Sequence, residues 1–341
     1  MPDASRRPTV AVTGVGALIG QGIARSLRPR GRVRIMGVDR RITPFSKTFC
    51  DAVEQKPAID EASEAYLDFW RGLVRREGIE LILPGLSVDM DFFNGNRAAF
   101  RDMGVKVALN REGLIALCAD KADFQKAYRA AGFPAIPSAR PESWEEALAA
   151  LGPAPLLLKP RRGEGSAGIV RLDDASDFAY WTRRSGDNWL MQTVMGTEAD
   201  EYTVGVYGLG DGTSLGPIIM RRRLTRSGHT GEVEVLDHPA IAALTGRIIR
   251  HFQPIGPTNL QFRMGGETPY LLEINPRFSS SCSLRAAFGF VEAEMCIDDL
   301  LEGRTPEQPV IRHGAAHRYN EDFIADTLPG KEPSGYAGDP V

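Results

Sequence analysis

The chain has 341 residues, of which 43% are hydrophobic and 25% are charged, as in an ordinary globular protein. This composition excludes a disordered or collagen-like chain, and the length predicts two or three subdomains. Lys and Arg total 41 against 44 Asp and Glu, a net charge of −3, which gives no indication of nucleic acid or an anionic membrane as a partner. The sequence has no apolar stretch of the ~20 residues that span a bilayer, and its four cysteines show no zinc or disulfide spacing. We therefore expect a soluble cytoplasmic protein with reduced cysteines.

Strand and helix patterns alternate in the first third of the chain. Buried strands are predicted at 9–13, 33–38, 81–84 and 105–109, and helices at 16–28, 66–77 and 94–103. This alternation is typical of a parallel, doubly wound α/β sheet. Residues 112–150 have a helical pattern, in which Asp120 is the expected N-cap of a helix over 121–131.

After Gly152 the pattern changes to short strands joined by glycine-rich turns. The strands are predicted at 156–159, 168–172, 190–194, 201–207, 214–221, 259–264 and 270–275, and the helices at 173–184, 239–251 and 283–301. This part is therefore expected to be an α+β region with antiparallel hairpins. The proline-rich residues after Arg304 are expected to wrap the surface or fray.

A glycine-rich turn follows the first predicted strand. Gly14, Gly16 and Gly20 form it, and Asp39 ends the next strand, as in a dinucleotide fingerprint. The spacing is GxGxxxG rather than GxGxxG, and the same glycines also allow a helix to pack closely on a sheet. An NAD(P)-dependent oxidoreductase is thus one alternative, and close packing without a cofactor is the other.

A predicted hairpin over residues 259–275 carries oxygen-bearing side chains. Alternation along its two strands places Gln261, Glu273 and Asn275 on one surface. Mg²⁺ prefers such oxygen ligands and completes its shell with water and phosphate oxygens. Arg277, which follows Pro276, would then direct its guanidinium at whatever the metal binds. A polar, solvent-facing hairpin is the alternative.

A strand ending in Lys159 leads into a glycine-rich loop, which is longer than a plain hairpin turn requires. It has no Walker A sequence, but its backbone N–H groups suit phosphates, and Lys159 would supply a positive charge. Lys121 by itself is expected to be an exposed helical lysine. Residues 192–194 offer backbone groups to a purine edge, and Glu201 offers a carboxylate to ribose hydroxyls.

Together these segments resemble the ATP-grasp superfamily, in particular the branch similar to the large subunit of carbamoyl-phosphate synthase. The resemblance implies a Rossmann-like pre-ATP-grasp domain with a doubly wound parallel sheet at 1–110, an ATP-grasp domain of two α+β subdomains at 111–305, and a C-terminal tail at 306–341. The two subdomains are expected to clasp the nucleotide, with a mobile lid subdomain at about 125–195.

The same resemblance implies the roles of individual residues. It makes these residues ATP-binding: Lys121, Lys159, Gly163, Glu164, Gly165, Ser166, Gly168, Gln192, Thr193, Val194 and Glu201. Gln261, Glu273 and Asn275 match the ligands of Mg²⁺ (or Mn²⁺), while Glu273, Asn275 and Arg277 match the catalytic residues. The step from Gly196 to Glu201 is longer than usual in the family, so Glu198 competes with Glu201 for the ribose.

The activity implied is that of an ADP-forming carboxylate–amine or carboxylate–thiol ligase, which activates the acid as an acylphosphate. Its partners would be a small-molecule carboxylate and an amine, with a homodimer as the expected assembly. The chain is too short for carbamoyl phosphate synthesis itself. The substrate site is expected to involve Arg221, Arg223, His229, Ser279 and Arg285. A solvated basic strand end is the alternative for the arginines, and a non-catalytic ATP-binding regulatory protein is the alternative for the whole chain.

Overall fold

A computed structural model describes residues 7–163, 168–225 and 228–324, and the chain divides into two compact units. Unit 1 comprises residues 1–109, 277–310 and 319–341, and unit 2 comprises 110–276 and 311–318. Residues 277–310 thus group with unit 1, whereas the sequence analysis expected 277–305 in one domain with 111–276 and 306–310 in the tail. Their helices pack on the first helix of unit 1, which explains this grouping.

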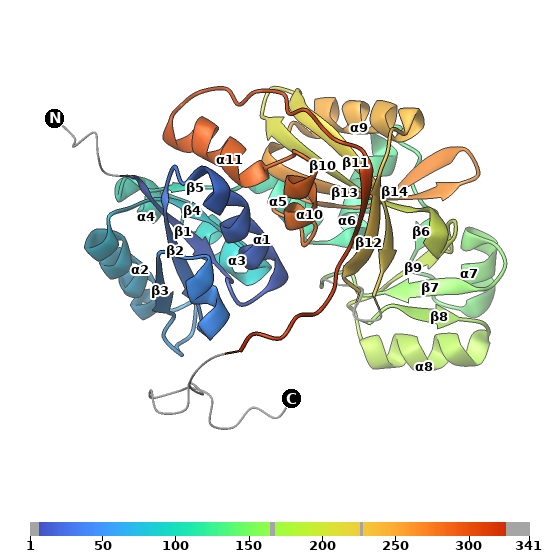
Figure 1. The fold of residues 1–341 in the computed structure, drawn as a ribbon. Coiled ribbons are helices and arrows are strands. Elements are labelled where there is room, and N and C mark those ends of the chain that lie inside the picture. Colours follow the sequence, from blue (N-terminus) through green and yellow to red (C-terminus); the bar gives the residue numbers. More distant parts are fainter. Residues whose placement is uncertain (1–6, 164–167, 226–227, 325–341) are drawn as a thin grey trace. The chain divides into compact units, whose positions relative to one another are not determined.

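Unit 1 is built on sheet A, a parallel sheet with the strand order β3-β2-β1-β4-β5 (Figure 1). Its strands are β1 (Thr9–Thr13), β2 (Arg34–Asp39), β3 (Ala52–Gln55), β4 (Ile79–Leu83) and β5 (Lys106–Val107). The predicted doubly wound parallel sheet is therefore confirmed. β3 was not predicted, because this edge strand buries none of its four residues and so has no apolar pattern.

The helices of unit 1 provide most of its aromatic core. α2 (Glu64–Glu77), α3 (Ser87–Gly95) and α4 (Arg97–Asp102) supply Trp70, Phe93 and Phe100 to one cluster. The remaining helices are α1 (Leu18–Leu27), α10 (Cys282–Ala287) and α11 (Glu292–Cys296), with short helical turns η1 (Arg28–Arg30), η2 (Pro44–Thr48) and η4 (Ile297–Leu301). The single helix predicted over 283–301 is wrong. Gly289, with φ of 101°, lies between α10 and α11, where a Cβ would meet the backbone oxygen of Val310 at 2.4 Å.

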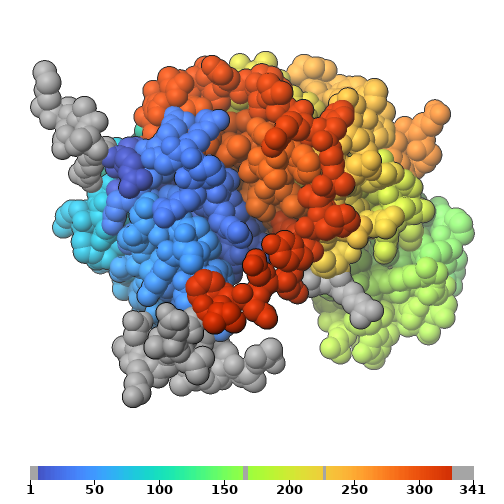
Figure 2. Space-filling view, in the orientation of Figure 1, coloured from blue at the N-terminus to red at the C-terminus, as the bar shows by residue number. Residues whose placement is uncertain are grey.

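The larger sheet of unit 2, sheet C, is antiparallel in the order β14-β13-β10-β11-β12-β15. Its strands are β10 (Glu201–Leu209), β11 (Ser214–Leu224), β12 (Thr230–Val235), β13 (Ile255–Gly265), β14 (Thr268–Asn275) and β15 (Gly314–His317). One face packs on α6 (Lys121–Ala130) and α9 (Pro239–Phe252), through residues such as Tyr128, Val204 and Phe262. β12 and β15 were not predicted; β15 lies at the surface beside β12 (Figure 2).

The smaller sheet of unit 2, sheet B, is antiparallel in the order β6-β9-β7-β8. Its strands are β6 (Ser138–Ala139), β7 (Leu156–Lys159), β8 (Val170–Leu172) and β9 (Leu190–Thr193), and it packs on α7 (Trp144–Leu151) and α8 (Ala175–Ser185). The expectation of helix throughout 112–150 is wrong, because α5 (Glu112–Cys118), α6 and α7 are separate and β6 lies between the last two. Gly132, with φ of 76°, ends the turn after α6, and Pro134 and Pro137 follow.

Both sheets of unit 2 thus form the α+β region expected from the sequence. Within the described ranges, no helix has the length and apolar character needed to cross a membrane.

Candidate functional site

Atoms of the protein itself pack closely around the glycine turn of unit 1. Asp39 Oδ2 accepts a hydrogen bond from Gly16 N at 2.8 Å, and its Oδ1 accepts one from Arg41 N at 3.1 Å. A Cβ on Gly20 would lie 2.2 Å from the Gly14 oxygen, and a Cβ on Gly14 would lie 2.6 Å from Leu86 Cγ. These glycines therefore serve close packing at the carboxyl ends of β1 and β4, and Asp39 supports the turn instead of reaching toward a ribose.

The predicted metal-binding hairpin has the expected register. Gln261 of β13 lies opposite Glu273 of β14, and Asn259 lies opposite Asn275. Asn275 Nδ2 donates to Glu273 Oε1 at 2.9 Å, and Thr203 Oγ1 of β10 donates to Asn259 Oδ1 at 2.7 Å. The hairpin thus brings one carboxylate and three amides to one side of sheet C, opposite the face that packs on α6 and α9.

This side of sheet C, which we call the polar face, includes Arg222, which alternation along the strand separates from Arg221 and Arg223. Arg222 of β11 donates from Nη2 to Glu201 Oε1 at 2.7 Å and to Gln261 Oε1 at 2.8 Å. Arg263 holds the other oxygen of Glu201, with Nε at 2.9 Å and Nη2 at 2.7 Å. The polar face consists of Glu201, Thr203, Arg222, Asn259, Gln261, Arg263, Glu273 and Asn275.

The negative charge of Glu201 is balanced by Arg222 and Arg263. Burial raises the pKa of its carboxyl, but Arg222 and Arg263 lower it more, so the pKa lies below the usual range. Both oxygens of Glu201 are bonded to arginine, and the side chain is only 5% exposed. Both carboxylate oxygens are thus bonded within the fold, and contact of Glu201 with ribose stays a prediction. Glu198, the other candidate, is exposed in η3 (Glu198–Asp200).

Lys159 lies at the end of β7, within electrostatic reach of the polar face. Burial lowers the pKa of its ammonium to about 8, with Glu273 and Glu201 acting to raise it and Arg263 and Lys121 acting to lower it. The ammonium of Lys159 is therefore coupled electrostatically to Glu273, one of the predicted metal ligands.

The glycine-rich loop after β7 is connected to the start of α6. Lys121 Nζ donates to the Gly163 oxygen at 2.7 Å, and Lys121 N donates to the Arg161 oxygen at 2.9 Å. Asp120 caps α6, as predicted, by accepting from Ala122 N at 2.9 Å, and it also pairs with Arg161 at 2.8 Å. Gly163 and Gly168 have φ of 130° and 74°. The predicted loop residues Glu164, Gly165 and Ser166 lie outside the described residues.

The predicted adenine segment lies at the end of β9. Gln192 is buried and donates from Nε2 to Ser138 Oγ at 2.9 Å, while Thr193 Oγ1 donates to the Leu151 oxygen at 2.7 Å. The side chain of Gln192 therefore joins β9 to β6, and that of Thr193 joins β9 to the end of α7. Val194 is exposed beyond the strand.

The structure places Arg221 and Arg223 on the other side of sheet C from the polar face. Arg221 pairs with Glu234 and Arg223 with Glu232 at 3.7 Å, all four on exposed positions of β11 and β12. Their exposure agrees with the solvated alternative, a substrate role for them stays a prediction, and Arg222 is the arginine that bonds to Gln261. His229 is exposed in the turn between β11 and β12.

The remaining predicted residues belong to unit 1. Arg285 is fully buried and pairs with Glu292 at 2.8 Å, so it is a structural ion pair and not an exposed substrate contact. Ser279 is buried at the start of α10, where its Oγ accepts from Ser281 N at 3.1 Å. Arg277 is half-buried, and its Nη1 donates to the Phe278 oxygen at 3.0 Å.

The donors on the polar face fit a hard cation. No group of three or more His, Cys, Asp or Glu that could hold a metal occurs in the part of the chain that the structure describes. Glu273 supplies a carboxylate and Asn275 and Gln261 supply amide oxygens, which suits Mg²⁺ with its preference for few protein oxygens plus water and phosphate. Gln261 is the least available of the three, because its oxygen already accepts from Arg222.

Comparisons with known proteins found one family model and many solved structures of similar fold. A family model described as "ATP-grasp in the biosynthetic pathway with Ter operon" matches residues 187–323, which include the polar face. No curated protein matches the chain in sequence.

Solved structures of several enzymes share the fold. Pyruvate carboxylase from Rhizobium etli is 16% identical with a TM-score of 0.70 over 91% of this chain, which spans only 30% of that enzyme. N5-carboxyaminoimidazole synthetase from Staphylococcus aureus, complexed with ADP, is 16% identical with a TM-score of 0.67 over 85% of this chain and 77% of its own. L-amino acid ligase from Bacillus licheniformis is 15% identical with a TM-score of 0.65 over 88% of this chain and 75% of its own. Similarity at this level of identity shows the fold.

Proposed function

We propose that this chain is an ATP-dependent ligase that activates a small-molecule carboxylate. Its fold and the family match over residues 187–323 support an ATP-grasp protein. The ATP-grasp resemblance on which the sequence analysis relied is confirmed. The proposal goes further, to the reaction and to the residues that perform it.

The observation that carries the proposal is the arrangement around Glu273. Its carboxylate lies opposite Gln261 and accepts from Asn275, and it acts electrostatically on Lys159 of the neighbouring sheet. A carboxylate that holds a cation near a half-buried lysine suits the triphosphate of ATP, because both positive charges can contact phosphate oxygens.

The reaction would proceed in two steps. A substrate carboxylate oxygen attacks the γ-phosphorus of ATP while the bond to the ADP oxygen breaks, which gives an acylphosphate and ADP. An amine, or another nucleophile such as a thiol, then attacks the acyl carbon, and inorganic phosphate leaves. Both steps depend mainly on positioning and on neutralising negative charge, so no nucleophile on the protein is required.

Each residue has a role in this scheme. Glu273 and Asn275, with Gln261 in support, would hold Mg²⁺ (or Mn²⁺), which supplies positive charge next to the phosphate oxygens. Lys159 and Lys121 would contact the phosphates, and the loop ending at Gly163 and Gly168 would cover them. Arg277 would stabilise the phosphoryl group in transfer.

Arg222 would act as a positioning residue and not as a substrate contact. It is 7% exposed and bridges Glu201 and Gln261, so it would hold Gln261 in place beside Glu273. The backbone at Val194 would meet the purine edge, and Glu198 is the better ribose ligand because Glu201 is bonded to two arginines. His229 is retained as a weaker candidate contact.

The cellular setting is part of the proposal. The four cysteines have no disulfide spacing in the sequence, as is usual in a reducing compartment, which supports a cytoplasmic location. A homodimer is proposed by analogy with similar enzymes.

The test is ATP turnover in the presence of hydroxylamine, which traps an acylphosphate as a hydroxamate. Pools of carboxylic acids are incubated with Mg·ATP, hydroxylamine and the full-length protein, and both ADP and hydroxamate are measured. We expect at least one pool to give the two products in equal amounts. ATP binding without ADP from any pool would favour a regulatory protein, and reduction of NAD(P) by a substrate pool would favour the oxidoreductase.

A further inference from the structure

The carboxylate of Asp120 has more partners than the N-cap of a helix needs. Its Oδ1 accepts from Ala122 N at 2.9 Å and from Asp123 N at 3.3 Å, which satisfies the first turn of α6. The same carboxylate also accepts from Arg161, with Nε 3.1 Å from Oδ1 and Nη2 2.8 Å from Oδ2. Asp120 therefore holds both the start of α6 and the chain that follows β7.

The pair between Asp120 and Arg161 is bidentate and shielded from solvent on the side of the acid. Two N–H···O bonds from one guanidinium to one carboxylate fix the orientation of the two groups as well as their distance. The side chain of Asp120 is only 5% exposed. Burial raises the pKa of its carboxyl, but Arg161 and the backbone N–H groups of α6 lower it more, so the pKa lies below the usual range. The acid is therefore charged at neutral pH.

The backbone after β7 is also held by Asn188, which lies just before β9. Arg161 N donates to the Asn188 oxygen at 3.4 Å, and Arg162 N donates to Asn188 Oδ1 at 2.9 Å. Asn188 Nδ2 donates in return to the Arg162 oxygen at 3.4 Å. Because Lys121 N also donates to the Arg161 oxygen at 2.9 Å, this stretch of backbone is fixed between α6 and the start of β9.

Lys121 connects these contacts to the proposed phosphate site. It follows Asp120 directly, so the carboxylate that holds Arg161 also determines where the first residue of α6 lies. The ammonium of Lys121 donates to the Gly163 oxygen at 2.7 Å, two residues beyond Arg161. The contacts therefore form a closed ring, from the Asp120 carboxylate through the backbone after β7 to the Lys121 ammonium.

Such a ring restricts a side chain that is otherwise flexible. A lysine ammonium sits on a four-carbon chain and has many positions available when nothing holds it. Holding it beside a fixed backbone oxygen removes part of this freedom before a ligand arrives, and pre-organisation of this kind increases affinity. A phosphate oxygen carries more negative charge than a peptide oxygen, so it can replace the Gly163 oxygen as the acceptor of Lys121.

We propose that Asp120 and Arg161 are positioning residues for the phosphate groups of the nucleotide, and that they act through Lys121. The inference rests on the proposed function, in which Lys121 contacts phosphate. It goes further by giving a function to a capping aspartate and to an arginine that need not touch the ligand. Their effect on binding should therefore be present for a phosphorylated ligand and absent for one without phosphate.

The first test follows the Lys121 ammonium without any nucleotide. The full-length protein is treated with a limiting amount of acetic anhydride, and the acetylation of each lysine is measured by mass spectrometry. Lys121 should react severalfold more slowly than an exposed lysine. Asp120→Asn and Arg161→Ala should each raise its rate severalfold, because the ring that holds the ammonium is then open.

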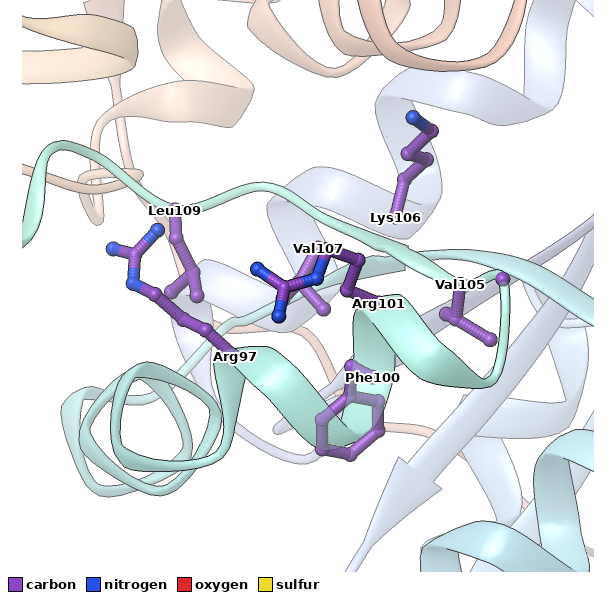
Figure 3. Close-up of a pocket in the computed structure, with 8 residues that line it drawn as sticks. Arg97, Phe100, Arg101, Val105, Lys106, Val107 and Leu109 are labelled. Atoms are coloured by element: carbon purple, nitrogen blue, oxygen red, sulfur yellow. The ribbon is translucent and has the colours of Figure 1, made fainter.

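Two exposed lysines give reference rates for this reaction. Lys126 lies on the same helix as Lys121, and Lys106 lies on β5 of unit 1. Lys106 is at the wall of a cavity of about 220 Å³, and its side chain extends away from the other labelled residues (Figure 3). Both reference rates should be the same in the wild type and in the two variants.

The second test compares Mg·ADP, by calorimetry, with adenosine, by ligand-detected NMR. Asp120→Asn keeps an N-cap, because Asn caps a helix about as well as Asp, but it removes the charge that pairs with Arg161. Asp120→Asn and Arg161→Ala should each weaken Mg·ADP binding on the order of tenfold and leave adenosine binding unchanged. In a Lys121→Ala background the same two substitutions should have little further effect on Mg·ADP.

Arg171→Ala is the matched control. It removes an Arg–Asp pair of 2.9 Å from β8 of the same sheet and should change neither measurement. Lys121 acetylation that is unchanged in both variants would overturn the inference, as would an equal loss of Mg·ADP affinity with and without Lys121. If acetylation responds as expected but the wild type binds no Mg·ADP, the proposed ATP site is contradicted and the positioning of Lys121 is not.

Discussion

Arg222 of β11 donates a hydrogen bond to Gln261 of β13, past the intervening strand β10, with Nη2 2.8 Å from Oε1. The same nitrogen lies 2.7 Å from Glu201 Oε1, so one guanidinium joins a buried carboxylate to a candidate metal ligand. This contact makes the central strands of sheet C and the proposed metal site one connected network.

Arg222 should matter for stability far more than its neighbour on the same strand. Arg222→Ala leaves the buried Glu201 with Arg263 alone, and breaking a buried pair costs about 3–5 kcal/mol. Arg221→Ala removes an exposed pair with Glu234 and should cost less than about 1 kcal/mol. Urea unfolding of both variants measures the difference, and equal losses would show that the network contributes nothing.

Glu273 should be required for turnover and not for folding. Glu273→Gln keeps the size of the side chain but removes the negative charge, and we expect ADP formation to fall by on the order of 10²–10³-fold. Glu267→Gln, in the exposed turn between β13 and β14, is the matched control and should keep full activity. A Glu273→Gln protein as active as the control would rule out the metal assignment.

Lys159 should couple nucleotide binding to proton uptake. Burial lowers the pKa of Lys159 to about 8, whereas the pKa of lysine in an unfolded chain is about 10.4. Between these two pH values the unfolded chain binds more protons than the folded one. The contribution of Lys159 to the free energy of unfolding therefore rises with pH in this range. A phosphate placed beside it would raise the pKa again. At about pH 8.5, binding of Mg·ADP should therefore take up a fraction of one proton.

Calorimetry in two buffers that differ in ionisation enthalpy measures this uptake. Lys159→Arg keeps a charge that does not titrate in this range, so its binding should be independent of the buffer. Uptake of equal size in the variant would assign the proton to another group.

Two glycine-to-alanine variants of unit 1 should differ in stability if the first glycine turn serves close packing. Gly20→Ala places a Cβ 2.2 Å from the Gly14 oxygen and should destabilise unit 1 by about 3 kcal/mol. Gly72→Ala, inside α2 with nothing within 4 Å, should be stabilising by about 0.5–1 kcal/mol. Thermal unfolding of the two variants separates these outcomes. If Gly20→Ala retains the wild-type stability, the turn has room for a ligand after all.

The sequence predicted the parts of the fold that have regular apolar patterns. The parallel sheet, the N-cap at Asp120 and the register of Gln261 with Glu273 follow from alternation and capping, which are local signals. β3 and β15 could not be predicted in this way, because they are short edge strands whose residues are largely exposed.

The side of the sheet on which Arg222 lies could not be predicted from the sequence, for a specific reason. Alternation separated Arg222 from Arg221 and Arg223, but it could not show which side was buried, since that depends on β12. The pattern of Thr230–Val235 alternates between buried and polar residues, and pairing it with β11 places Glu232 and Glu234 opposite Arg223 and Arg221. Similarly, the burial of Arg285 follows from its pairing with Glu292, which lies beyond the break at Gly289.

The central claim, that the polar face of sheet C belongs to an ATP site, is tested most directly by ligand-induced thermal stabilisation. The melting temperature is measured with Mg·ADP, a non-hydrolysable Mg·ATP analogue, NAD and NADP, each with and without EDTA. At 100 times its Kd a ligand stabilises the folded state by about 2.7 kcal/mol, which is readily observed. We predict stabilisation by the two adenine nucleotides that is lost with EDTA and in Glu273→Gln. Stabilisation by NAD or NADP, with none by Mg·ADP, would contradict the account.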